Sequence, residues 1–326
     1  MNSDRLMHTM RAGKRFLIDR QYRRMIIAAT GFYDYLSDEK YLRKIYYANT
    51  GRKLNLENPK TFNEKLQWLK LYNRQDKYII LSDKYLVKDY VAKLIGCEHI
   101  VPTLGVWDDP DQIDFEQLPN QFVLKCNHNS GLGMCICKDK ESLNISQARA
   151  NLARGLAQNY YQHDREWTYK KIPRKIVAEK YMKDSNVIDI LPGVKADGLI
   201  DYKFYCFNGE PRFLYVGFAN IVDGNKHDLM TYLTLDWKLT PFIRPDHEQL
   251  PTIPERPKCF DELVEYARVL ADDIPFVRVD FFIIENQIYF SEFTFSPGGG
   301  YGIFYPEEWE RKLGDWIKLP EKIINE

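Results

Sequence analysis

The sequence of 326 residues lacks several features that would assign it to a class directly. Its six cysteines form no CxxC pair, so neither a disulfide scaffold nor a zinc cage is indicated, and a reducing compartment fits best. Lys plus Arg and Asp plus Glu each number 46, so no overall positive field favours nucleic acid as a partner. The chain also has no GxSxG or HExxH motif and no internal repeat. With 44% hydrophobic and 28% charged residues, it is typical of a globular protein with two or three lobes around a cleft.

The first thirty residues are basic rather than apolar. Arginine and lysine recur from Arg5 to Arg24, whereas the longest apolar run there, 25–29, is too short for a signal-peptide core or a transmembrane helix. We therefore expect a cytoplasmic protein. The basic stretch also carries Phe16 and Tyr22. It is typical of a solvated helix face, with peripheral association at the inner, anionic face of a membrane as the alternative.

Apolar spacing predicts helices up to about residue 95 and mixed strands and helices after Gly96, which gives an α+β fold class. Thr61 followed three residues later by Glu64 is a capping box and predicts a helix through Leu71. Ser82 is a second helix-start signal. The predicted strands are 100–106, 122–125, 134–138, 172–182, 202–207, 213–218, 276–284 and 287–295, and further helices are predicted at 146–163 and 260–272.

The strongest local signal is a predicted hairpin near the end of the chain. Alternation places Arg278 and Asp280 on one face of its first strand, and Phe290, Glu292 and Thr294 on one face of its second. Charges among Val, Ile and Phe are costly unless a cation or a function holds them. Two carboxylates and a hydroxyl suit a Mg²⁺ ion that also binds phosphate oxygens. The alternative is a solvated hairpin face on which Arg278 pairs with a carboxylate.

A second signal is a lysine placed before a glycine-bearing loop. Lys125 ends a predicted strand, and the loop after it holds Asn127, Ser130, Gly131 and Gly133. A lysine in this position can reach a phosphate while loop N–H groups cover it. An ordinary hairpin turn is the alternative.

Three further positions are weaker as isolated signals. Glu179 and Lys180 end an apolar strand before Met182, where backbone groups could bind a purine edge, although a charged strand end is the alternative. Lys203 lies among aromatic residues and must either extend to solvent or meet an anion. Lys84, in the first turn of its predicted helix, would by itself be ordinary surface.

Taken in order, these segments resemble the ATP-grasp superfamily. The resemblance is closer to its TupA-like branch, which is associated with teichuronopeptide and other bacterial surface-polysaccharide biosynthesis. No single segment is decisive, but their order along the chain makes the resemblance specific. The segments that carry it are 58–70, 82–84, 122–128, 178–181, 201–209, 278–281 and 289–295.

The resemblance implies an ATP-grasp fold, in which two α+β lobes grip ATP, with an extra helical region before them. The implied division is a helical N-terminal extension (1–57), an N-terminal lobe (58–115), an ATP-grasp lid subdomain (116–185) and a C-terminal catalytic lobe (186–326). Lys84 and Lys125 would contact the phosphates under the loop 127–133. Glu179, Lys180 and the backbone near Met182 would hold the adenine.

The resemblance also implies a catalytic group on the C-terminal lobe. Asp280 and Glu292 would ligate Mg²⁺, and Lys203 would contact the terminal phosphate. Arg278 would stabilise the transferring phosphoryl group and the later oxyanion. Many ATP-grasp ligases carry asparagine where this chain has Thr294, and a hydroxyl ligates Mg²⁺ more weakly.

The implied activity is an ATP- and Mg²⁺-dependent carboxylate–amine ligase. ATP would phosphorylate a carboxyl group, and an amine or amino acid would displace the phosphate to form an amide in the assembly of a capsule or other surface polysaccharide. The carboxylate partner would be a uronic acid or a similar glycan precursor. By elimination we expect its pocket along 221–246, with Tyr232, Trp237 and Arg244. The alternatives are a kinase that acts on a glycan hydroxyl, a glycosyltransferase of the same pathway, and a non-catalytic nucleotide sensor.

Overall fold

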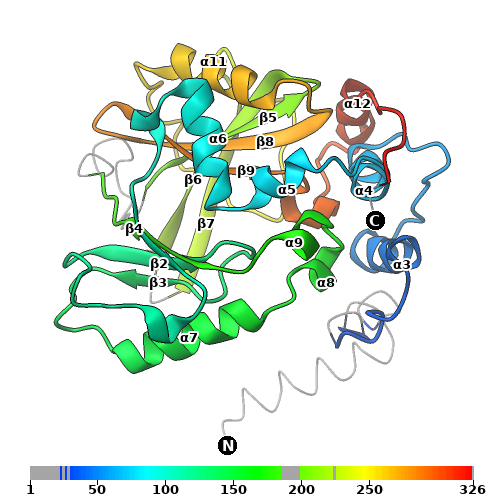
Figure 1. The fold of residues 1–326 in the computed structure, drawn as a ribbon. Coiled ribbons are helices and arrows are strands. Elements are labelled where there is room, and N and C mark those ends of the chain that lie inside the picture. The colour runs from blue at the N-terminus through cyan, green and yellow to red at the C-terminus, as the bar shows by residue number, and fades with distance from the viewer. Residues whose placement is uncertain (1–22, 24–25, 28–29, 185–198, 223–224, 325–326) are drawn as a thin grey trace, which may run out of the picture.

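The computed structural model describes residues 23, 26–27, 30–184, 199–222 and 225–324. Two antiparallel sheets lie beside each other, with helices on their outer faces and a helical group at one end (Figure 1). The α+β fold class that the sequence predicts is therefore confirmed. The basic stretch before residue 23 lies outside the described residues. Within the described part of the chain, no helix is both long and apolar enough to cross a bilayer.

The smaller sheet has four strands in the order β1-β4-β2-β3. These strands are β1 (Thr103–Trp107), β2 (Phe122–Cys126), β3 (Cys135–Cys137) and β4 (Ile176–Lys180). Helix α7 (Ile145–Ala157) runs below the sheet in Figure 1, and its Ala148 and Leu152 pack against Phe122 and Leu124 of β2. Strand β1, inside the predicted 58–115 lobe, pairs with β4 of the next predicted region.

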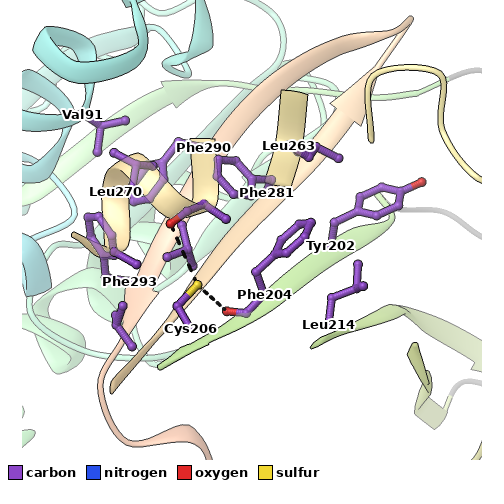
Figure 2. Packing of buried hydrophobic residues seen from close by; sticks show 14 of the residues in the cluster. Val91, Tyr202, Phe204, Cys206, Leu214, Leu263, Leu270, Phe281, Phe290 and Phe293 are labelled. Carbon is purple, nitrogen blue, oxygen red and sulfur yellow. Dashed lines mark hydrogen bonds between the residues drawn. The ribbon is translucent and has the colours of Figure 1, made fainter. Parts of the chain in front are cut away.

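The larger sheet has five strands in the order β7-β6-β5-β8-β9. They are β5 (Asp201–Phe207), β6 (Glu210–Val222), β7 (Asn225–Thr234), β8 (Phe276–Ile284) and β9 (Gln287–Thr294). Helices α6 (Leu86–Ile95) and α11 (Phe260–Ala271) cover one face. On that face Phe204, Phe281 and Phe290 pack under Leu263 and Leu270 (Figure 2). Lys203, Tyr215 and Asp280 therefore lie on the opposite face.

Most of the remaining helices gather at one end of the larger sheet (Figure 1). They are α3 (Asp38–Thr50), α4 (Phe62–Tyr72), α5 (Lys77–Ser82), α8 (Tyr161–Asp164), α9 (Thr168–Lys171) and α12 (Glu308–Trp316). Short 3-10 turns occur at Cys97–His99, Pro110–Gln112 and Pro297–Gly300. The aromatic residues Phe62 of α4, Phe276 of β8 and Phe304 form a second core between α4 and the sheet.

The helix-start signals have different outcomes. The capping box is confirmed, because the Thr61 side chain accepts from the Glu64 N–H while the Glu64 carboxylate accepts from the Thr61 N–H. Ser82 was wrong as a start, since it is the last residue of α5. The carboxylate of Asp83 instead accepts from the N–H groups of Tyr85 and Leu86, at 2.8 and 3.2 Å, and thereby begins α6.

The hairpin forms with one correction to its face pattern. Asp280 and Glu292 lie on paired strands as predicted, and they face each other because the register shifts by one residue after the pair of Phe281 with Phe290. Ser291 is the extra residue of this β-bulge. Phe290 therefore turns to the core face and does not share a face with Glu292 and Thr294, because its buried ring packs with Phe281.

Helix α12 lies against the start of α4 through a glycine, which gives a test of this packing. A Cβ added to Gly314 would lie 2.2 Å from the carbonyl oxygen of Lys60, a backbone atom that cannot move aside. Gly314→Ala should therefore destabilise the protein by about 1–3 kcal/mol, although alanine favours helix. Chemical denaturation measures the change. Arg311→Ala, on the exposed side of α12, should change stability little, and an equal effect of both variants would contradict this packing.

Candidate functional site

The larger sheet brings one row of polar side chains into register on the face opposite helices α6 and α11. Tyr232 of β7 pairs with Tyr215 of β6, which pairs with Lys203 of β5. Lys203 pairs with Asp280 of β8, which pairs with Glu292 of β9. Paired residues on adjacent antiparallel strands have their Cβ atoms about 5 Å apart. Lys203 and the hairpin carboxylates Asp280 and Glu292, which the sequence analysis identified from separate signals, therefore belong to one continuous row.

Asp280 is the centre of this row, with no solvent exposure. Arg278 donates to both of its carboxylate oxygens, from Nε at 2.7 Å and from Nη2 at 2.5 Å, and Lys203 Nζ lies 2.7 Å from Oδ2. Burial alone would raise the pKa of Asp280, but the two cations outweigh it and lower the pKa. The sequence left open whether Lys203 extends to solvent or pairs with an anion. It pairs with two anions, Asp280 and, at 3.2 Å, Asp201.

Glu292 and Thr294 complete the proposed oxygen set. Arg278 Nη2 reaches Thr294 Oγ1 at 2.9 Å and Glu292 Oε1 at only 3.4 Å. The Glu292 side chain is 40% exposed, so its carboxylate keeps capacity for another partner. Among the described residues no cluster of three or more acidic, His or Cys groups is arranged to hold a metal. Two neighbouring carboxylates still fit Mg²⁺, which normally takes one or two protein carboxylates together with phosphate oxygens and water.

A cleft of about 550 Å³ lies between the two sheets. Five of the residues predicted to bind nucleotide line it: Lys84, Lys125, Glu179, Lys180 and Met182. Its other walls are largely apolar and come from both sheets and from α6. They include Val87, Ile100, Val101, Val123, Ile136, Leu199, Phe282 and Phe290. Apolar walls with a few polar groups are the usual lining of a small-molecule site.

Glu179 joins two lysines inside this cleft. Lys125 Nζ lies 2.6 Å from one of its oxygens, and Lys88 Nζ lies 2.7 Å from the other. Burial raises the pKa of Glu179, but the two ammonium groups outweigh burial and lower the pKa below its usual value. Sequence reasoning missed Lys88. Lys88 lies four residues after Lys84, and both lysines line the cleft. Because residues four positions apart lie on the same side of a helix, this spacing could have indicated Lys88.

The loop after β2 divides into buried and exposed parts. Lys84 Nζ donates to the Asn129 carbonyl, and burial lowers the pKa of this lysine. Asn127 has no exposed surface, and its amide nitrogen donates to Asp83 Oδ2 and the Pro173 carbonyl, both at 2.9 Å. Its side chain therefore positions the loop. Ser130 and Gly131 are exposed, whereas Gly133 is buried against Gly155 of α7.

Helix α4 holds the glycine loop that follows β9. Three buried polar side chains on one side of α4 donate to carbonyl groups of this loop. Asn63 donates to Gly302 at 2.7 Å, Gln67 to Gly299 and Gly300 at 3.0 and 2.9 Å, and Lys70 to Gly299 at 2.7 Å. Because Gly299 has φ of 65°, a residue with a side chain would be strained there. These hydrogen bonds fix the loop, and its Gly298 lines the same cavity as Lys203 and Arg278.

A second cavity of about 550 Å³ lies along the polar face of the larger sheet, and Asp201 lines both cavities. Lys203 and Arg278 line it beside Asp280, and Tyr232 and Arg244 also line it. Trp237, the third residue expected there, does not. Its ring packs on Phe260 of the core, and its Nε1 donates to the Pro254 carbonyl. The side chains of 221–228 lie outside the described part of the structure.

A buried carboxyl group next to α4 and the glycine loop, that of Glu310, gives a prediction for the pH dependence of stability. Glu310 accepts from the Phe304 N–H at 2.8 Å and from Asn63 Nδ2 at 3.0 Å, and burial raises its pKa to about 7. The folded state therefore binds a proton that the unfolded state has already released. This contribution to stability is complete below about pH 4.5 and is lost as the pH rises through about 7.

The measurement is denaturant unfolding from pH 4 to 8 for the wild type and for Glu310→Gln, which cannot titrate. The unfolding free energy of the wild type relative to the variant should fall as the pH rises. A difference that stays flat or increases with pH would show that Glu310 is ionised at its ordinary pKa.

Comparisons with known proteins point to the same family as the sequence resemblance. A family model described as TupA-like ATP-grasp matches residues 64–318. A search of curated proteins finds no match. Similar solved structures include D-alanine–D-alanine ligase from Helicobacter pylori, at 15% identity and a TM-score of 0.42, covering 79% of this chain and 69% of that one.

Two further structures are similar over a smaller share of their own length. D-alanine–D-alanine ligase from Bacillus anthracis, complexed with ATP, shows 15% identity and a TM-score of 0.38 over 73% of this chain and 63% of that one. N5-carboxyaminoimidazole ribonucleotide synthetase from Thermus thermophilus shows 13% identity and a TM-score of 0.38 over 72% and 51%. The chain therefore spans about half to two thirds of the length of these two proteins.

Proposed function

This chain belongs to the TupA-like ATP-grasp family, and from that premise we propose that it is an ATP- and Mg²⁺-dependent ligase that joins a carboxylate to an amine and releases ADP. The observation that carries the proposal is the in-register row of Lys203, Asp280 and Glu292, with Arg278 beside it, at the junction of two cavities. One cavity would take the nucleotide and the other the carboxylate substrate.

The first cavity supports ATP as the nucleotide. Its apolar walls suit an adenine ring, with Glu179, Lys180 and the backbone at Met182 at the end of β4. Lys84 and Lys125 would bind the phosphates, and Ser130, Gly131 and the rest of the exposed loop would cover them. The Asp83 and Asn127 side chains tie this loop to α6, so the positions of both lysines are coupled.

The catalytic row supports phosphoryl transfer. Asp280 and Glu292 would hold the magnesium, with the Thr294 hydroxyl beside them, and the metal would neutralise charge on the phosphates. Lys203 would contact the terminal phosphate, and Arg278 would stabilise the transferring group. Because such reactions depend mostly on positioning and charge, a buried arginine and lysine held by Asp280 are well suited to this task.

The second half of the reaction would occur at the same residues. Phosphorylation turns the carboxylate into an acyl phosphate, and an amine then attacks its carbonyl carbon. The C–O bond to phosphate breaks, phosphate leaves with the bonding electrons, and the amine loses a proton. Arg278 would stabilise the tetrahedral oxyanion. The loop held by α4 would help to exclude water, which would hydrolyse the intermediate.

For the substrates, we propose an amine or amino acid and a uronic acid or similar carboxyl of a bacterial surface-polysaccharide precursor. The family name supports the pathway, and the polar lining of the second cavity supports an acidic, hydroxylated substrate. The proposal includes a cytoplasmic location, with the basic segment before residue 23 as the part that would contact the inner face of the membrane. The division at 57, 115 and 185 likewise remains our proposal for the domains.

The deciding experiment is an ADP-release assay with ATP, Mg²⁺ and a panel of uronic acids and their nucleotide sugars, with and without amino acids and amino alcohols. We expect ADP only when a carboxylate and an amine are both present, and a product lighter by one water than their sum in mass spectrometry. ADP without amine, together with a phosphorylated hydroxyl, would identify a kinase instead. The matched control is Glu292→Gln, which should abolish turnover while preserving the fold, because Glu292 is partly exposed.

Asp280→Asn is a less informative variant. It would leave Arg278 and Lys203 without their shared counter-ion in a buried site, and such a loss typically costs about 3–5 kcal/mol of stability. Lost activity in that variant would therefore mix catalysis with unfolding. Glu292→Gln avoids this problem, and wild-type turnover in it would overturn the proposed metal site.

Lys125 provides a separate test of the nucleotide site. Lys125→Met should weaken ATP binding by about tenfold or more, since it removes a charge that faces the phosphates, and calorimetry can measure this. The control is Lys175→Met. Lys175 is also paired with a carboxylate, 2.7 Å from Asp108, but it does not line the cleft, so ATP should bind as to the wild type. Equal affinities of both variants would exclude Lys125 from the site.

A further inference from the structure

The second cavity contains a cation that the proposed chemistry does not use. We propose that Arg244 is a specificity-determining residue that binds a second anionic group, a carboxylate or a phosphate, on the substrate whose reacting carboxylate lies beside Arg278. This inference rests on the proposed function and names the class of substrate for that site: a molecule with two anionic groups. Both arginines line the same cavity of about 550 Å³, so one molecule can contact both.

The structure holds Arg244 in a fixed position. Its neighbour Ile243 exchanges two backbone hydrogen bonds with Tyr305, at 2.9 and 2.8 Å. The guanidinium lies close against Gly302, where an added Cβ would come within 2.2 Å of Arg244 Cζ, and Gly298 lies beside it. Only 11% of the side chain is exposed. A cation fixed in this way loses little conformational freedom when it binds a ligand.

The charge of Arg244 is only weakly balanced within the protein. Arg278 and Lys203 share the fully buried Asp280, and Lys203 also contacts Asp201. In contrast, Asp246 is the only acceptor for Arg244 among the described residues, and its side chain is 51% exposed. Because the Asp246 carboxylate is half-exposed to solvent, an anionic group of a ligand can join it or replace it at Arg244.

The remaining donors of Arg244 suit an oxyanion. Asp246 accepts from Nε and Nη2, which leaves Nη1 without an acceptor in the described chain. A guanidinium has five N–H donors in a planar arrangement that matches carboxylate and phosphate oxygens. The buried side chain of Tyr232 lies in the same wall of the cavity. A donor without a protein acceptor is expected where a polar wall faces a ligand or ordered water.

A purely structural role for Arg244 is the competing interpretation, because it packs on the glycine loop at Gly298 and Gly302. The two roles differ in what the variants change. If Arg244 has only a structural role, its substitution should change the melting temperature and the nucleotide affinity. Arg244→Lys should then change the affinities for all ligands by the same factor. An anion-binding residue would alter only the affinity for ligands that carry the second charge.

The test is calorimetric binding in the presence of Mg²⁺ and a non-hydrolysable ATP analogue. The probes are glucuronate, with one anionic group, glucarate, with two carboxylates, and glucuronate 1-phosphate, with a carboxylate and a phosphate. The wild type should bind at least one of the latter two at least tenfold more tightly than glucuronate, and which one it prefers identifies the second group. Arg244→Gln should abolish that preference and leave the affinities for glucuronate and nucleotide unchanged. Arg244→Lys should keep part of the preference.

The matched control is Arg256→Gln. Arg256 belongs to the same irregular segment and also pairs with an exposed aspartate, Asp261, at 2.6 Å, but it does not line the cavity. It should leave all three probe affinities unchanged. A preference that survives in Arg244→Gln, or a wild type that shows none, would overturn the inference while the proposed function stands. A wild type that binds no nucleotide would overturn the proposed function and this inference with it.

Discussion

A carboxylate without any contact to solvent organises the catalytic side of this protein. Asp280 accepts from Arg278 and Lys203, and through Arg278 it also fixes the position of Thr294. Isolated buried charges are very costly, whereas a paired and hydrogen-bonded group is tolerated. Strands β5, β8 and β9 must therefore keep their register, because a slip of one residue would turn these charges into the aromatic core on the other face.

The sequence analysis identified the site residues where the signal was local. The capping box at Thr61 depends on residues three positions apart, and the placement of Asp280 and Glu292 on one hairpin follows from two short strands that flank a two-residue turn. It failed where distant contacts decide the outcome. Phe290 was placed on the wrong face because the core around Phe281 stabilises a bulge that alternation cannot indicate. Trp237 was assigned to a pocket, but an aromatic core residue and a pocket residue look the same in sequence.

The two cavities of the protein meet at one strand. Asp201 of β5 lines both of them, and Lys203, two residues along the same strand, faces the second. Neither cavity alone contains all the groups that phosphoryl transfer to a carboxylate would need. Lys125 and Glu179 lie in the first, whereas Arg278 and Lys203 line the second. Under the proposed function, the reacting phosphate would therefore lie at the junction between the two cavities.

The hydrogen bonds between α4 and the glycine loop also determine how late in synthesis this part of the chain can fold. Gln67 and Gly299 are 232 residues apart in sequence, and Asn63 and Glu310 are 247 apart. As α4 emerges from the ribosome, the buried polar groups of its inner side have no acceptors until almost the whole protein has been made. During that interval Asn63, Gln67 and Lys70 must remain in water or be covered by a chaperone. Ordering of this loop is consequently a late event, so a truncated nascent chain lacks part of the lining of the second cavity, to which Gly298 belongs.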